Sequence, residues 1–269
     1  MNAVRTKQEE VDRKVLSDGV PSLLFRIAKS AHFRIRQQVN RISSIPRKRA
    51  VEQINHIAAR NIPNSEKFSL IYQKRLWFKL APHLNPDKSL SGFGSTVTST
   101  SVFRRQLEQF LRENNSRSFF DAPCGDFNWM KHVKLPHDCN YLGGDIVTSL
   151  IANHQKDFKG DRRQFIYFDL TVDTFPAADV WLCKDCLQHL SNSDILLVLN
   201  NFRRSQVKIA LISNHIGCQQ NIDIKTGGWR FVDLTLAPFN LPPPRQKLTD
   251  APVDGEPRYI GVWHRIDLS

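Results

Sequence analysis

The chain has 269 residues, 41% of them apolar, which is enough for one large α/β domain with a substantial core and an extension. No run approaches the ~18 apolar residues that a membrane-spanning helix needs, and the polar, acid-containing start at Met1–Glu10 is typical of neither a signal peptide nor a transit peptide. With five cysteines, an odd number, the sequence predicts a reduced, cytoplasmic protein with free thiols.

Positive charge is concentrated near the start of the chain. The net charge is +12, and residues 1–80 hold 17 Lys/Arg against 6 Asp/Glu, so residues 81–269 are nearly neutral. Within the basic part, Pro21–Ser43 has apolar residues at helical spacings, with Arg and Lys largely off that stripe. A basic amphipathic helix can lie on an anionic membrane, and we expect peripheral contact of this kind through residues 20–49. Two alternatives stay open: the helix packs on the main domain, or it is solvated and has no partner.

Three helices are predicted before the first strand: Ala50–Arg60, Glu66–Leu80 and Thr98–Asn114. Between the second and the third lies Pro82–Ser95, a loop rich in Pro, Gly and Ser. Gly92 and Gly94 make the segment Ser91–Thr96 flexible and able to close over something.

The stretch Ser118–Met130 (S-F-F-D-A-P-C-G-D-F-N-W-M) is the most informative part of the chain. Ser118–Ala122 predicts a buried strand, Pro123 and Gly125 predict a turn, and Asn128 can cap a helix. A strand, a Gly turn and a helix in this order form the phosphate- or adenosyl-binding corner of a doubly wound sheet. There a ligand can approach the bare glycine backbone, and the helix N-terminus offers free N–H groups.

A second signal lies one strand further along. Tyr141–Val147 (Y-L-G-G-D-I-V) predicts a short strand that places Asp145 at its tip, 20 residues after Gly125. An acid at this position can accept hydrogen bonds from a ribose diol, so the series favours a nucleoside-containing cofactor. The alternative is a β-turn with an exposed Asp.

Strands and helices then alternate. Strands are predicted at Asn140–Asp145, Gln164–Asp169, Ala178–Cys183 and Val207–Ser213, and helices at Thr148–Phe158 and from Ser191, where Ser191-x-x-Asp194 matches a capping box. Strands separated by helices imply parallel βαβ units.

Two more strands are predicted near the end of the chain, at Trp229–Leu236 and Tyr259–Ile266. The intervening Ala237–Arg258 contains six prolines, so no crossover helix can form there. An antiparallel return needs no such helix, and we therefore expect the last strand to run antiparallel to its neighbour.

These segments together resemble class I S-adenosylmethionine-dependent methyltransferases. D-A-P-C-G-D-F-N-W-M is similar to motif I of that superfamily, with Pro123 and Asp126 where the general motif has Gly. From about Phe68 to the C-terminus the chain resembles a bacterial branch of the superfamily that shares further motifs. Those motifs fall here at Ser91–Thr96, Gly143–Val147, Cys183–Ser191, Thr226–Arg230 and Pro238–Pro242. The resemblance implies a Rossmann-like, seven-stranded mixed sheet with an antiparallel last strand, and S-adenosyl-L-methionine as the cofactor.

The resemblance also implies roles for the residues at the strand ends. The turn under the methionine part of the cofactor would be formed by Asp121, Pro123, Cys124, Gly125 and Asp126. Asp145 would hold the ribose hydroxyls, Asp169 would bond the adenine amine, and Leu170 would pack on the ring. Any parallel strand can end in a solvated Asp, but three at successive strand ends favour a common site.

The segment after the fourth predicted strand could carry chemistry. Its C-x-x-C-x-x-H pattern could suggest zinc, but Cys183 lies in a predicted buried strand and no second pair follows at finger spacing. We therefore interpret the cysteines as buried thiols and predict no metal site. Asp185 or His189 could take a proton from a hydroxyl acceptor; the alternative for His189 is a hydrogen bond at a helix start.

Trp229 and Arg230 fall in the region that shapes the acceptor pocket in related folds. Arg230 could hold an anionic acceptor, whereas the alternative for Trp229 is core packing.

The sequence thus predicts a methyltransferase domain over residues 66–269 and a basic helical extension over residues 1–65. The predicted reaction is methyl transfer to an oxygen of a small-molecule or glycan acceptor, the glycan being implied only by the resemblance. No Asn-Pro-Pro-Tyr-type motif follows the fourth strand, so nucleic acid is not the predicted acceptor. The rival hypothesis is a non-catalytic adaptor, in which a degenerate methyltransferase core presents a basic arm to membrane or RNA.

Overall fold

The computed structural model describes residues 46–250 and 258–268, and the chain divides into two compact units, Met1–Arg47 and Lys48–Ser269. The helix predicted at Pro21–Ser43 lies outside the described residues, so the membrane contact of residues 20–49 stays a prediction. Buried residues of the helix at 46–59, including Ile54 and Ile57, belong to the core of the second unit. The predicted boundary at residue 65 likewise stays a prediction.

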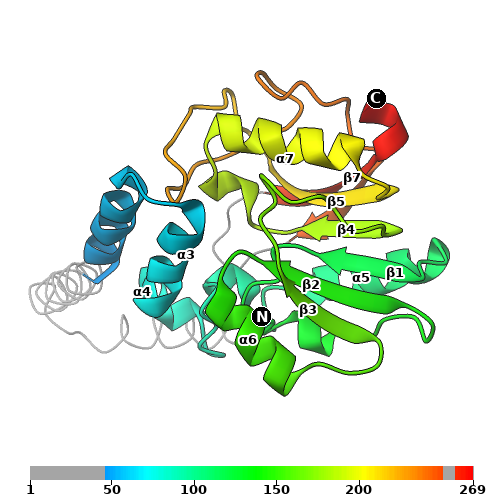
Figure 1. The fold of residues 1–269 in the computed structure, drawn as a ribbon. Helices are drawn as coiled ribbons and strands as arrows, with labels where there is room; N and C mark the ends of the chain where they lie inside the picture. Colours follow the sequence, from blue (N-terminus) through cyan, green and yellow to red (C-terminus); the bar gives the residue numbers. More distant parts are fainter. Residues whose placement is uncertain (1–45, 251–257, 269) are drawn as a thin grey trace, which may run out of the picture. The chain divides into compact units, whose positions relative to one another are not determined.

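Within the described residues the second unit is built on a seven-stranded sheet with the strand order β3-β2-β1-β4-β5-β7-β6 (Figure 1). Strands β1 to β5 pair in parallel, whereas β7 runs antiparallel to both β5 and β6. This confirms the predicted mixed sheet with an antiparallel last strand. The strands are β1 (Ser118–Asp121), β2 (Asn140–Asp145), β3 (Arg163–Tyr167), β4 (Val180–Cys183), β5 (Ile209–His215), β6 (Gln246–Asp250) and β7 (Arg258–His264).

The prediction of a strand at Trp229–Leu236 is wrong, because that segment forms no strand. Its backbone N–H groups bond irregular partners instead: Arg230 donates to the Gln188 carbonyl, and Leu234 donates to the Asn214 side chain. The sixth strand is Gln246–Asp250, which follows the prolines that end at residue 244.

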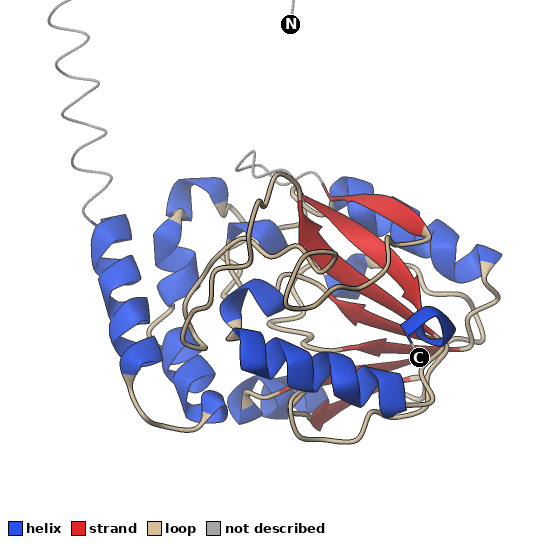
Figure 2. Cartoon of the chain, turned by 90° about the horizontal axis from the view of Figure 1, so that it is seen from above, coloured by secondary structure: helices blue, strands red, loops and turns tan. Residues whose placement is uncertain are grey.

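Helices cover both faces of the sheet (Figure 2). The helices in the described part of the chain are the helix at 46–59, α3 (Asn64–Gln73), α4 (Leu76–Leu80), α5 (Ser101–Glu113), α6 (Thr148–Asp157) and α7 (Asn192–Arg204). The first three lie beyond one edge of the sheet (Figure 1). Ser191 caps α7 as predicted, since its Oγ accepts from the Asp194 N–H at 3.1 Å. The return half of the predicted capping box is not formed, because the Ser191 N–H donates to Thr226 Oγ1 at 2.8 Å and not to the Asp194 carboxylate.

Two helix predictions are corrected. The helix predicted at Glu66–Leu80 is broken at Arg75, whose φ of 53° is left-handed, so α3 and α4 are separate. After Asn128 there is only a 3₁₀ turn, Met130–His132. Phe127 has a φ of 58° and its ring is buried among aromatic rings of β2, β3 and α6, so the chain turns there instead of entering a helix.

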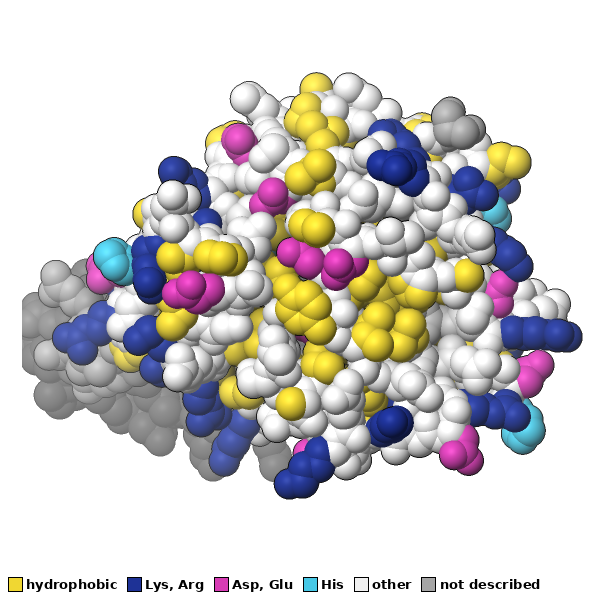
Figure 3. Space-filling model, viewed as in Figure 1, with side chains coloured by type: hydrophobic (Ala, Val, Ile, Leu, Met, Phe, Trp, Pro, Cys, Tyr) yellow, Lys and Arg dark blue, Asp and Glu magenta, His cyan; other side chains and the backbone are white. Residues whose placement is uncertain are grey.

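The core lies in two layers, one on each face of the sheet. Successive strand residues point to opposite faces, so in β4 Trp181 packs with the α7 residue Phe202, while Leu182 belongs to the layer under α5. No helix in the described part of the chain is long and apolar enough to cross a membrane. On the face shown in Figure 3 apolar side chains gather near the centre, and most Lys and Arg lie toward the margins.

Candidate active site at the carboxyl edge of the sheet

The carboxyl ends of the parallel strands meet at one edge of the sheet, which α3 and α4 face (Figure 1). Asp121 ends β1 and Asp145 ends β2, while Asp169 follows β3 by two residues. Asp185 and His189 follow β4. The sequence therefore correctly placed these side chains along one edge, which is where ligands bind in open α/β sheets.

In the turn after β1, both the backbone N–H and the backbone carbonyl of Gly125 are hydrogen-bonded to side chains. Gly125 has a φ of 57°, which favours glycine, and its N–H donates to Asp145 Oδ2 at 2.9 Å. Its carbonyl accepts a hydrogen bond at 2.7 Å from Nε2 of His154, a buried residue of α6. Pro123 is half-buried, and the Cys124 N–H bonds the Gly144 carbonyl at 2.9 Å. His154 was missed by the sequence analysis, because only the packing of α6 brings it to the turn.

Asp121 and Cys124 lie beneath the turn, where they support it. Asp121 is 2% exposed and accepts a hydrogen bond from Tyr141 Oη at 2.7 Å. Burial raises its pKa to about 7 and raises the pKa of the Cys124 thiol well above its ordinary value.

Asp145 is 3% exposed, and its two oxygens accept the N–H groups of Gly125 and Val147, each at 2.9 Å. Burial raises its pKa to about 6, although those two hydrogen bonds act in the opposite direction. Each carboxylate oxygen can accept a second hydrogen bond, so a hydroxyl donor can still be bound.

Asp169 lies in a tight turn of its own. Its Oδ1 accepts hydrogen bonds from the Thr171 N–H at 2.9 Å and the Thr171 hydroxyl at 2.6 Å. Its Oδ2 has no hydrogen-bond partner among the described residues, so it can accept from an amine. The neighbouring Leu170 is 8% exposed and belongs to the core layer on the α7 side.

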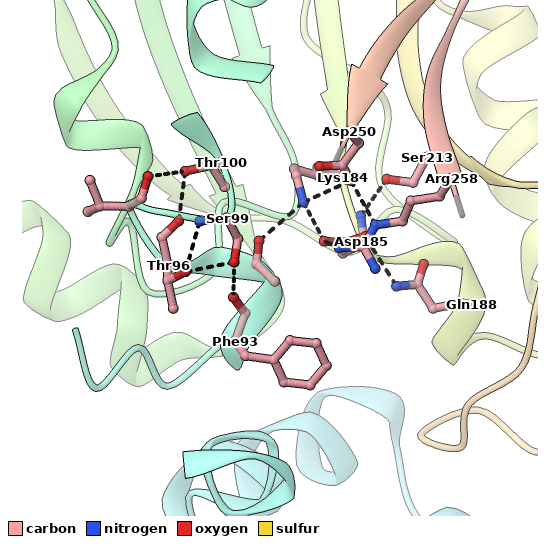
Figure 4. A network of polar contacts seen from close by, with 12 residues as sticks. Phe93, Thr96, Ser99, Thr100, Lys184, Asp185, Gln188, Ser213, Asp250 and Arg258 are labelled. Carbon is pink, nitrogen blue, oxygen red and sulfur yellow. Dashed lines mark hydrogen bonds and ion pairs between the residues drawn. The ribbon is translucent and has the colours of Figure 1, made fainter. Parts of the chain in front are cut away.

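The segment Ser89–Thr96, which we call the strap, runs along the edge and contacts both the β1 turn and the end of β4. Asp126 Oδ2 accepts hydrogen bonds from Ser89 Oγ at 2.8 Å and from the Leu90 N–H at 2.6 Å. At the other end, the Gly94 carbonyl lies 3.4 Å from Lys184 Nζ (Figure 4). The two glycines predicted that Ser91–Thr96 can close over something, whereas no signal in the sequence indicated that Asp126 holds the strap.

Asp185 belongs to a buried cluster of two acids and two bases (Figure 4). Its carboxylate contacts Lys184 and lies 3.4 Å from Arg258 Nη2, while Asp250 Oδ2 accepts from Arg258 Nε at 2.7 Å. Burial alone would raise the pKa of Asp185, but Arg258 and Lys184 outweigh it and hold the pKa well below its ordinary value. The charges cancel within the cluster, and Asp185 is a poor proton acceptor at neutral pH.

His189 is better suited to take a proton. Its Nδ1 lies 2.8 Å from the Gly228 carbonyl, and because a carbonyl only accepts, Nδ1 must carry the hydrogen. Burial lowers its pKa, so the ring is neutral at pH 7 and Nε2 keeps its lone pair. No hydrogen bond to Nε2 comes from the described residues, and one face of the ring packs on Trp77 at a centroid distance of 5.1 Å.

The two predicted acceptor residues differ in accessibility. Trp229 is 47% exposed and meets Phe231, itself 37% exposed, edge to face at 5.2 Å, so it is available to a ligand and does not pack in the core. Arg230 is 7% exposed, and its guanidinium donates to the Leu190 carbonyl and to Asn192 Oδ1. Both Nη atoms of Arg230 thus hold its loop to the segment after β4, while its buried Nε has no hydrogen-bond partner among the described residues, and its role as an anion ligand stays a prediction.

No protein-family model and no curated protein matches the chain. Solved structures do match. PigF with SAH is similar at 15% identity over 81% of this chain and 68% of that one, with a TM-score of 0.53. The mitomycin 7-O-methyltransferase MmcR is similar at 14% identity over 80% and 67% of the two chains, with a TM-score of 0.49. The methyltransferase domain of a bacterial CtHen1 is similar at 13% identity over 61% and 98%, with a TM-score of 0.45.

The first of these likenesses, the strand order and the reversed β7 together show the Rossmann-like fold of class I S-adenosylmethionine-dependent methyltransferases. The predicted fold is confirmed.

Proposed function

We propose that this protein is an S-adenosylmethionine-dependent methyltransferase that acts on a hydroxyl oxygen of a small-molecule or glycan acceptor. The observation that carries the proposal is the arrangement at the carboxyl edge of the sheet. There the Gly125 N–H donates to Asp145 and the Gly125 carbonyl accepts from His154, while the neutral His189 follows β4 along the same edge.

The residues present at the edge fit the cofactor that this fold implies. Asp145 can accept from ribose hydroxyls, and Asp169 Oδ2 can accept from the adenine amine with Leu170 beside it. The turn from Pro123 to Asp126 would lie under the methionine part. The cofactor supplies a methyl group already activated on a sulfonium.

The protein's own part is then positioning, exclusion of water and removal of one proton. His189 Nε2 accepts the proton of the acceptor hydroxyl, while the bond from Nδ1 to Gly228 fixes the ring and its tautomer. Asp185, held ionised by Lys184 and Arg258, stabilises the resulting imidazolium by its charge but does not take the proton itself.

The charges near the edge favour a neutral acceptor. The buried acids and bases around Asp185 cancel, and burial lowers the pKa of both His189 and His215. Trp229 and Phe231 offer exposed aromatic faces on which a ring can pack.

Calorimetry with S-adenosylhomocysteine tests the proposal. The full chain should bind it, and Asp145→Ala should abolish or greatly weaken binding, whereas Asp138→Ala, at an exposed acid, should not. Tight NADH binding without any response to S-adenosylhomocysteine would refute the proposal. Mass spectrometry of small molecules and cell-envelope extracts incubated with labelled cofactor would then identify the acceptor.

One observation favours the second candidate, a non-catalytic adaptor with a basic membrane- or RNA-binding arm. A Cβ built on Gly125 would lie only 2.6 Å from Ser91 Oγ, so the chain itself already contacts the bare face of the turn. An adaptor would bind anionic vesicles or RNA and show no affinity for S-adenosylhomocysteine. A cytoplasmic methyltransferase would bind S-adenosylhomocysteine. If it also contacts the membrane peripherally through residues 20–49, it would bind anionic vesicles as well.

A further inference from the structure

Two hydroxyl groups from the N-terminal part of the unit lie against the β1 turn. Tyr72 Oη of α3 and Ser91 Oγ of the strap are 2.8 Å apart and share a hydrogen bond. Ser91 Oγ also accepts from the Asp126 N–H at 3.0 Å. A Cβ on Gly125 would lie 2.6 Å from Ser91 Oγ and 3.3 Å from Tyr72 Oη, so this hydroxyl pair faces the side of Gly125 that has no side chain.

The pair is built into the fold. Tyr72 is 8% exposed, its ring meets Trp77 edge to face at 4.9 Å, and burial raises the pKa of its phenol, which keeps it protonated. Gly92 follows Ser91 with a φ of 92°, which favours glycine, and a Cβ built on it would lie 3.5 Å from Trp77 Cβ, so the strap runs close to α4 where it leaves the turn. Asp126 holds the preceding residues, Ser89 and Leu90.

The order of residues along the edge locates the pair relative to a bound cofactor. The strand order places Asp169 and Asp145 on one side of the Gly125 turn, after β3 and β2, and His189 on the other side, after β4. Trp77 contacts both Tyr72 and His189. The hydroxyl pair therefore lies between the acids suited to the adenosine part and the proposed base. A cofactor whose adenosine lies toward β3 and whose reacting end lies toward β4 passes the pair with its amino-acid part.

We propose that Tyr72 and Ser91 bind the amino-acid end of the cofactor, so that the strap and α3 supply one wall of the cofactor site. The two hydroxyls share one hydrogen bond, which leaves one O–H free to donate to the cofactor carboxylate. A hydrogen bond to a charged group is among the stronger polar contacts that a site can make. This inference rests on the proposed function, because it assumes that the edge binds the cofactor.

Calorimetry on the full chain with two ligands tests it. S-adenosylhomocysteine carries the amino-acid part, whereas 5′-methylthioadenosine has the same adenosine and lacks it. Tyr72→Phe and Ser91→Ala should each weaken S-adenosylhomocysteine binding roughly tenfold, the loss typical of a hydrogen bond to a charged group. Both variants should bind 5′-methylthioadenosine like the wild type.

Tyr259→Phe is the matched control, since it also removes a buried phenol hydroxyl. That hydroxyl accepts a hydrogen bond from Asn214 Nδ2 at 2.8 Å and is not part of the Gly125 turn. It should bind both ligands normally. If Tyr72→Phe is poorly folded in a thermal melt, Ser91→Ala alone decides. Equal losses for the two ligands, or no loss for either, would overturn the inference. A wild-type chain that binds neither ligand would instead overturn the proposed function, and this inference with it.

Discussion

Replacing Gly125 by alanine tests the packing of the strap on the β1 turn. An L-residue at a φ of 57° is strained by roughly 1–2 kcal/mol. The new Cβ would lie 2.6 Å from Ser91 Oγ, too close for any normal contact, so Ser91 must move. Its hydrogen bonds to Tyr72 and the Asp126 N–H then weaken, at about 1 kcal/mol each. We therefore expect a total destabilisation of about 3–4 kcal/mol.

Denaturant unfolding would measure this loss, and two controls separate its parts. Gly217→Ala introduces the strain alone, since Gly217 has a φ of 81° with no atom within 4 Å of a built Cβ. It should lose only roughly 1–2 kcal/mol. In a Ser91→Ala background the main clash disappears, because Ser91 Cβ lies 3.6 Å from the built atom and only Tyr72 Oη, at 3.3 Å, must still shift slightly. The double-mutant cycle should then show a coupling of about 2 kcal/mol. Equal losses for Gly125→Ala and Gly217→Ala would refute the packing argument.

Three further predictions concern the proposed site. Affinity for S-adenosylhomocysteine should fall as the pH drops through about 6, because burial raises the pKa of Asp145 to about 6 and only its ionised form accepts both ribose hydroxyls. Calorimetry across pH 5–8 would measure this change, and the Asp145→Asn variant should not show it. Ionising this buried acid also disfavours folding, so its contribution to stability is present below its ordinary pKa and is lost as the pH rises through about 6. Once the acceptor is known, His189→Ala should lower turnover by ~10²–10⁴ and spare cofactor affinity, with partial rescue at high pH; unchanged turnover would exclude His189 as the base. Deleting residues 1–45 should keep cofactor affinity but reduce salt-sensitive binding to anionic vesicles, and a full-length chain that ignores such vesicles at low salt would contradict membrane contact.

The parallel pairing of the first five strands and the reversal of the last strand could be predicted, because short apolar runs alternate with helices and the proline-rich segment before the last strand excludes a crossover helix. The failures have local physical causes. Trp229–Leu236 has the composition of a strand, but its N–H groups are bonded by the segment after β4 and by side chains of β5. Arg75 interrupts a helical pattern that continues on both sides of it: its backbone is left-handed, with a φ of 53°, and nothing in the apolar spacing marks this residue as a break.

The candidate site was predictable only where it is local in sequence. Gly125 and Asp145 stand in a recognisable order of strand, turn and strand, and they prove to be bonded to each other. Tyr72 and His154 reach the same turn from helices that precede and follow it, and no spacing in the sequence relates them to Gly125. The one available signal was the pair of glycines in the strap, which predicted a flexible segment able to close over something but did not indicate that it packs on the Gly125 turn.

The strap makes the two halves of the edge interdependent. One end is bonded to Asp126, next to the glycine against which the cofactor would lie, and the other end has Gly94 between Arg258 and Asp185. A Cβ on Gly94 would lie 3.0 Å from the Arg258 guanidinium and 3.2 Å from the Asp185 carboxylate, so this end has little room to shift. A ligand that displaces Ser91 from the turn must therefore act on the same short segment that borders the Asp185 cluster. The proposed cofactor region and the Asp185 cluster therefore share the strap, which contacts Asp126 at one end and Lys184 at the other.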